Sequence, residues 1–122
     1  MSAFREALGR IAERVEGTRA VAILGLDAIP VEIHGATQGE GLSIEAVAAE
    51  LVALVKSARN PRTEMETGPI REICVVGERF RAVLSRITPE YYLLLLLGEE
   101  GSLGRGRYEL ERAALALEKE MI

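Results

Sequence analysis

The stretch Tyr91-Tyr92-Leu93-Leu94-Leu95-Leu96-Leu97 decides how this chain of 122 residues folds. Five consecutive leucines are too few to cross a bilayer, which takes ~20 apolar residues. In a helix they would point all around the axis, whereas a strand that is covered on both faces has such a continuous apolar run. The sequence therefore predicts a central strand here, with helices packed against both faces of its sheet.

The composition is typical of a single globular domain that spans residues 1–122. Hydrophobic residues make up 48% and charged residues 28%, which suffices for both a packed core and a polar surface. A formal net charge of −4 and an aromatic content of 4% disfavour nucleic acid as a partner, because its binding relies on Lys, Arg and stacking aromatics. With one cysteine and a charged N-terminus, we expect a cytoplasmic protein without membrane insertion.

Three segments have the apolar spacing of amphipathic helices: residues 2–16, residues 43–59, and the segment after the glycine-rich corner at 98–107. Their predicted buried faces are Phe4, Leu8, Ile11 and Val15 in the first; Ile44, Val47, Ala48, Leu51, Val55 and Ala58 in the second; and Leu110, Ala113, Ala114, Leu117 and Met121 in the third.

The middle helix is unusual because its second face is not charged. That face carries Ala46, Ala49 and Ala53, flanked by Glu50 and Ser57. A helix that is apolar most of the way round is usually buried on two sides, and small side chains let another helix come close. The alternative is that these alanines are present because alanine favours helix.

The remaining segments read as strands and turns. Residues 19–26 form a second doubly covered strand, and a turn at Asp27 and Pro30 leads to an alternating strand at 31–34 and a loop at 35–41. Residues 61–69 read as a polar loop. Residues 70–87 read as a hairpin with a two-residue turn at Gly77-Glu78. That turn pairs Val76 with Arg79, Val75 with Phe80 and Ile73 with Ala82. The order of helix, two strands, helix, three strands and helix predicts an antiparallel α+β fold.

No catalytic, cofactor-binding or metal-binding constellation is evident, so we expect no enzyme and no cofactor. His34 lies on an alternating strand, and we expect Cys74 to be a small buried hydrophobe. The glycines at 98–106 match neither a phosphate-binding loop nor a dinucleotide fingerprint. Arg105 and Arg107 oppose the dipole at the start of the last helix, which hints at another role such as contact with an anionic partner.

Two segments carry a resemblance to a known family. Residues 91–121, YYLLLLLGEEGSLGRGRYELERAALALEKEM, resemble the Roadblock/dynein-light-chain superfamily, most closely its bacterial MglB-type branch. In that family an apolar last strand runs through a glycine-bearing turn into a helix that begins R-Y-x-L-x-x-A-A. The segment VAILGLDAIPVEIHG, residues 21–35, resembles the first hairpin of the family, but Ala28-Ile29-Pro30 replaces the more familiar Gly-Leu-Pro. The resemblance covers nearly the whole chain.

The resemblance implies a profilin-like αββαβββα fold, with a five-stranded antiparallel sheet and helices on both faces. It also implies a homodimer in which the edge strand at 70–76 pairs with its copy and the two middle helices lie side by side. The predicted dimer interface consists of Ala46, Ala49, Glu50, Ala53, Ser57, Glu72, Cys74 and Val76. An edge strand that would otherwise stay unpaired agrees with this expectation.

The function that the resemblance implies is binding of a small Ras-like GTPase, with acceleration of GTP hydrolysis as a further option. Two alternatives remain open. The chain is a signalling or motility scaffold whose partner is not a GTPase, or it is a small-ligand sensor with a cavity between sheet and helix. The large leucines argue for a filled core and therefore against the sensor.

Overall fold

The computed structural model describes residues 2–35 and 43–121, and the predicted loop at 35–41 lies mostly outside these ranges. Along the chain, the elements are α1 (Ser2–Arg14), β1 (Thr18–Gly25), β2 (Pro30–Gly35), α2 (Ile44–Ala58), α3 (Pro61–Thr67), β3 (Glu72–Val76), β4 (Phe80–Thr88), β5 (Tyr91–Gly98) and α4 (Leu103–Met121).

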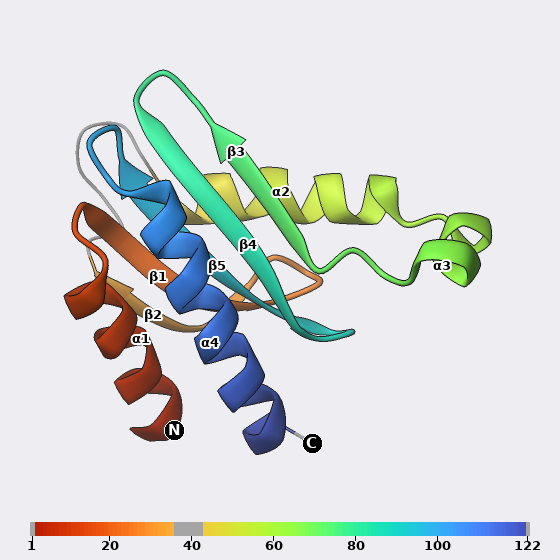
Figure 1. Ribbon diagram of the computed structural model, residues 1–122, viewed down its shortest axis with the longest axis horizontal. Helices are drawn as coiled ribbons and strands as arrows, with labels where there is room; N and C mark the ends of the chain where they lie inside the picture. Colours follow the sequence, from red (N-terminus) through yellow and green to blue (C-terminus); the bar gives the residue numbers. More distant parts are fainter. Residues whose placement is uncertain (1, 36–42, 122) are drawn as a thin grey trace.

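Within the described ranges, the strands form one five-stranded sheet in the order β2-β1-β5-β4-β3, and every neighbouring pair is antiparallel (Figure 1). The leucine strand β5 lies in the middle, between β1 and β4. Its five leucines are at most 2% exposed, which confirms the prediction of a central strand covered on both faces.

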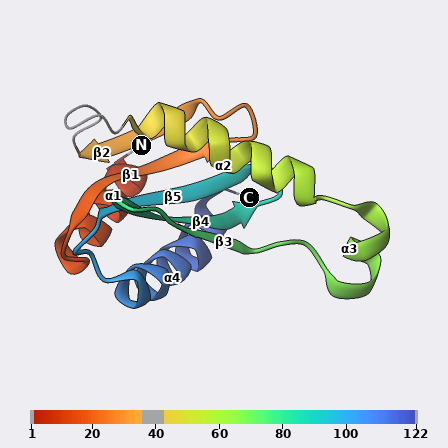
Figure 2. The same cartoon turned by 90° about the horizontal axis from the view of Figure 1, so that it is seen from above.

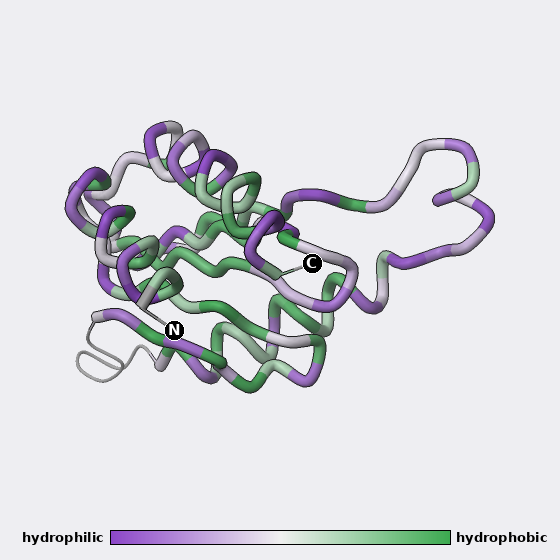
Figure 3. Tube along the Cα trace, turned by 90° about the horizontal axis from the view of Figure 1, so that it is seen from below, coloured by the Kyte–Doolittle hydropathy of each residue, from purple (hydrophilic) through white to green (hydrophobic). Residues whose placement is uncertain are grey.

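The pleat of β5 divides its leucines between two cores, because successive side chains point to opposite faces of a sheet. Leu93, Leu95 and Leu97 pack with α1 and α4, whereas Leu94 and Leu96 pack with α2. Figure 2 shows α2 on one side of the sheet and α1 and α4 on the other. The strands between these layers form the most hydrophobic part of the trace in Figure 3. The sheet is therefore the middle layer of an α+β sandwich.

The predicted helical faces agree closely with the burial of the side chains. The buried residues are Leu8, Ile11 and Val15 of α1; Ile44, Ala48, Leu51, Val52 and Val55 of α2; and Leu110, Ala114 and Leu117 of α4. Ser43 caps α2, because its Oγ accepts a hydrogen bond from the backbone N–H of Ala46 at 3.3 Å. Ala58, predicted to be buried, is exposed at the end of α2.

The short helix α3 was not predicted, since residues 61–69 read as a polar loop. It starts directly after α2, with Asn60 as its N-cap and Pro61 at the first helical position. The Asn60 Oδ1 accepts from the backbone N–H of Arg62 at 3.0 Å. The Asn-Pro pair that ends α2 is therefore also the start signal of α3, which the prediction of a loop did not take into account.

The predicted register of the β3–β4 hairpin was wrong by two residues. Val76 pairs with Arg81, Val75 with Ala82 and Ile73 with Leu84. The Gly77 N–H donates to the Phe80 carbonyl at 2.8 Å, so the turn residues are Glu78 and Arg79 rather than Gly77 and Glu78. A Cβ at Gly77 would lie 2.3 Å from a Phe80 ring carbon, so the glycine makes room for this ring. A slip of two residues preserves the faces, and Val75, Phe80 and Ala82 still share the α2 side as expected.

Candidate protein interaction site

The second face of α2 is exposed in the single chain. All five residues predicted for the helix part of a dimer interface, Ala46, Ala49, Glu50, Ala53 and Ser57, are exposed. Leu54 of the same helix is 49% exposed. One copy of the chain therefore covers only one side of α2, and the small apolar side remains open.

The neighbouring edge of the sheet is open as well. β3 lies at the end of the sheet, and no described strand pairs with its outer side. Val76 is 61% exposed and Glu72 is half-buried. An edge strand of this kind presents unpaired backbone N–H and C=O groups, which are a ready template for another strand.

Cys74 is exposed, so the prediction of a small buried hydrophobe was wrong for the single chain. Its side of the sheet is the side that α4 covers, but α4 packs on β4 and β5, and the edge strand lies beyond them. The Cys74 Sγ–H donates to Glu72 Oε1 at 3.6 Å. Partial burial raises the pKa of the Cys74 thiol above its ordinary value, and the Glu72 carboxylate raises it further, while Arg107 acts in the opposite direction.

The arginines at the start of α4 contact carboxylates of their own chain. Arg107 Nε donates to Glu72 Oε1 at 2.7 Å and so ties α4 to the edge strand. Arg105 lies 3.2 Å from Glu109, a residue that is 4% exposed, and its Nε donates to the Arg14 carbonyl at the end of α1. These contacts explain why two cations occupy an unfavourable end of a helix dipole: they connect elements of the fold.

An apolar groove lies between α2 and the β3–β4 hairpin, next to the open surfaces. It has a volume of about 330 Å³ and is lined by Ala46, Val47, Glu50, Leu51, Leu54, Val75 and Phe80. Ala46 and Glu50 belong both to this groove and to the predicted interface. Leu54 was not predicted as part of the interface, although it follows Glu50 by four residues and Ala46 by eight, a spacing that puts it on the same face of a helix.

Across residues 2–35 and 43–121, no three His, Cys, Asp or Glu side chains gather in a way that could hold a metal ion. His34 is exposed on β2. In the same two ranges, no helix has both the length and the apolar character needed to cross a membrane.

Comparison by sequence gives no match to a protein-family model and none to a curated protein. Comparison of the fold gives similar solved structures. MglC from Myxococcus xanthus is 30% identical, with 97% of this chain and 98% of that chain covered and a TM-score of 0.68. The gliding protein MglB from Thermus thermophilus is 16% identical, with 97% of this chain and 87% of that chain covered and a TM-score of 0.82.

A more distant likeness extends to profilin II from Acanthamoeba castellanii, which is 16% identical, with 87% of this chain and 89% of that chain covered and a TM-score of 0.52. The fold is thus the profilin-like α+β arrangement that the sequence predicts, with α3 as an addition. The identity to MglC extends over nearly the full length of both chains. The chain belongs to the Roadblock/dynein-light-chain superfamily, in its bacterial MglB-type branch.

Proposed function

We propose that this protein is a homodimeric regulatory module that binds a small Ras-like GTPase. The observation that carries the proposal is the adjacency of two open surfaces, the small-residue face of α2 and the unpaired edge of β3. Membership of the family supplies the expected kind of partner. The proposed interface contains the eight predicted residues, which are exposed or half-buried in the single chain, together with Leu54.

Symmetry defines the arrangement of the proposed dimer. Suppose that the β3 strands of two copies join their sheets into one, with both α2 helices on the same side of it. The two copies are then related by a two-fold axis perpendicular to the joined sheet. Such an axis pairs β3 with its copy in the antiparallel sense. It also brings the two α2 helices together across the axis, where Ala46, Ala49 and Ala53 permit a close approach. Both open surfaces are then covered by one contact.

In this proposal the chain supplies a binding surface, and the nucleotide and its Mg²⁺ belong to the GTPase. A regulator of this kind acts by stabilising one conformation of the GTPase, so its affinity must differ between the nucleotide states. Acceleration of hydrolysis would be a consequence of that preference.

Nucleotide-dependent capture tests the proposed partner. The protein is immobilised and exposed to each Ras-like GTPase of the same genome, loaded either with a non-hydrolysable GTP analogue or with GDP. We expect one of them to bind more tightly in one nucleotide state. Equal binding in both states would contradict the regulatory role. The absence of binding to every one of them would contradict the GTPase assignment and favour the scaffold alternative.

A further inference from the structure

The segment that connects α2 to β3 forms an arm that projects from the body of the molecule. It contains α3 and its flanking residues, 59–71, and extends past the end of the sheet (Figures 1 and 2). None of the residues of α3 is buried. The arm is therefore accessible to a second molecule.

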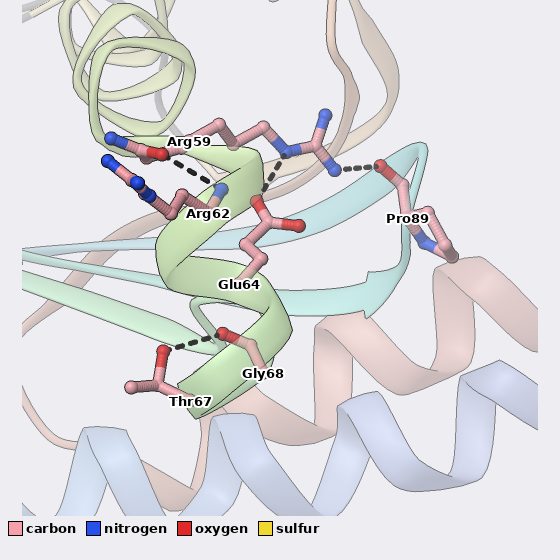
Figure 4. A network of polar contacts seen from close by, with 7 residues as sticks. Arg59, Arg62, Glu64, Thr67, Gly68 and Pro89 are labelled. Carbon is pink, nitrogen blue, oxygen red and sulfur yellow. Dashed lines mark hydrogen bonds and ion pairs between the residues drawn. The ribbon is translucent and has the colours of Figure 1, made fainter.

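Polar contacts connect the arm to the body of the molecule and hold its own residues together. Arg59 joins it to the turn between β4 and β5, because Nη2 donates to the Pro89 carbonyl at 3.2 Å, and its Nε lies 4.0 Å from Glu64 Oε2 (Figure 4). Within the arm, the Thr67 hydroxyl donates to the Thr63 carbonyl at 2.9 Å. These contacts reduce the conformational entropy that the arm would lose on binding.

Met65 of α3 is 89% exposed, more than any other large hydrophobic side chain in the described residues. Single exposed hydrophobic residues are common and need no explanation by themselves. Here the exposed methionine lies on a projecting segment that precedes β3. The apolar groove of the same chain lies at the other end of β3, since Val75 and Phe80 line it, so Met65 is far from the groove within one copy.

The proposed dimer brings the arm of one copy to the groove of the other, and this step rests on the proposed function. Antiparallel pairing places the N-terminal end of β3 beside the C-terminal end of the strand in the second copy. The arm precedes the N-terminal end of β3, whereas Val75 and Phe80 of the groove belong to its C-terminal end and the following hairpin. The arm begins at the end of α2. The same axis places this end beside the first turn of α2 in the other copy, and that turn carries Ala46 and Val47.

We propose that Met65 of each copy inserts into the groove between α2 and the β3–β4 hairpin of the other copy. The chemistry of the two surfaces matches: the groove has mostly apolar walls, and methionine is a flexible side chain that fills irregular apolar gaps. Charge matches as well. Arg62 precedes Met65 by three residues and shares its side of α3, while Glu50 is the charged residue at the groove. The contact occurs twice in a dimer, once on each side of the axis.

Thiol crosslinking between two differently tagged, co-expressed copies tests this contact. Both copies carry Cys74→Ser, which removes the natural cysteine. One copy also carries Met65→Cys and the other Ala46→Cys at the groove. A bis-maleimide reagent with a short spacer should join the two tags. The matched control replaces Met65→Cys by Thr63→Cys, because Thr63 is exposed on the opposite side of α3, and should give much less product.

Dimer dissociation provides a second readout. Met65→Ser should leave the unfolding of the isolated copy unchanged, since the side chain is exposed there, and should raise the dimer Kd by about tenfold for each of the two contacts. Equal crosslinking from positions 63 and 65, with an unchanged Kd for Met65→Ser, would overturn the inference and leave the homodimer standing. Monomers at every concentration would overturn both the inference and the proposed function.

Discussion

Ala28 has a left-handed backbone conformation, with a φ of 66°, in the turn between β1 and β2. Its N–H donates to the Gly25 carbonyl at 3.0 Å, and Asp27 Oδ1 accepts from the Ile29 N–H at 2.9 Å, so the turn is fixed on both sides of the residue. A left-handed conformation costs a residue with a Cβ ~1 kcal/mol, a cost that glycine does not have. Ala28 occupies the position where the family more often has glycine.

Ala28→Gly should therefore stabilise the fold by about 0.5–1 kcal/mol, because the relief of strain exceeds the added entropy of the unfolded chain. Chemical denaturation followed by circular dichroism measures the change. Ala116→Gly, an exposed substitution inside α4, is the control and should destabilise by about 1 kcal/mol. A loss of stability on Ala28→Gly would show that the turn does not strain this residue.

The Cys74 thiol has a raised pKa, first through partial burial and then through the charge and hydrogen bond of Glu72. Glu72→Gln removes the negative charge and leaves the opposing effect of Arg107, so the pKa should fall. More thiolate is then present at a given pH, and alkylation of Cys74 by iodoacetamide should accelerate at about pH 8. The pH at half-maximal rate should move downward relative to the unsubstituted protein, and an upward shift or no shift would contradict the assigned role of Glu72.

At the scale of single elements, α4 contains two glycines with different surroundings. A Cβ at Gly106 would lie 2.8 Å from Leu95 Cδ2, inside the core, whereas a Cβ at Gly104 would have no neighbour within 4 Å. Gly106 is therefore a point where α4 approaches the leucine strand closely.

Gly106→Ala should destabilise the protein by roughly 1–2 kcal/mol, since overpacking of the core outweighs the better helix propensity of alanine. Gly104→Ala should be neutral or stabilise by up to about 1 kcal/mol, because only the propensity changes. Thermal unfolding of the pair measures both effects under one condition. Similar shifts for the two substitutions would mean that α4 does not pack on Leu95 as closely as described.

The elements also show what the sequence could and could not predict. The leucine strand and the helix stripes were predictable because a long apolar pattern has one physical explanation, burial. The hairpin register was not predictable, because Gly77-Glu78 and Glu78-Arg79 are both possible two-residue turns. Which of them forms depends on how Phe80 packs over Gly77. The exposure of Cys74 was missed because it depends on how far α4 reaches across the sheet, which local sequence does not encode.

At the scale of the whole molecule, the sandwich has one helix layer on each side, and each layer exposes a leucine to the same extent. Leu54 of α2 and Leu115 of α4 are both 49% exposed. In the proposed dimer, only Leu54 lies at the contact, because α4 is on the opposite side of the sheet (Figure 2).

Leu54→Glu should therefore raise the dimer Kd by roughly 30-fold or more, since it places an unpaired charge in an apolar contact. Leu115→Glu, matched in residue type and exposure, should leave the Kd within about twofold. Dilution experiments monitored by light scattering compare the two. Equal weakening of the dimer by both substitutions, or an effect confined to Leu115→Glu, would mean that the dimer contact does not lie on the α2 side of the sheet.

The most direct test of the central claim is sedimentation equilibrium of the unsubstituted protein over a wide range of concentrations. We predict a molar mass of twice the 13.3 kDa of one chain, because α2 and β3 both need a second copy to be covered. A mass of 13.3 kDa at the highest attainable concentration would contradict that claim.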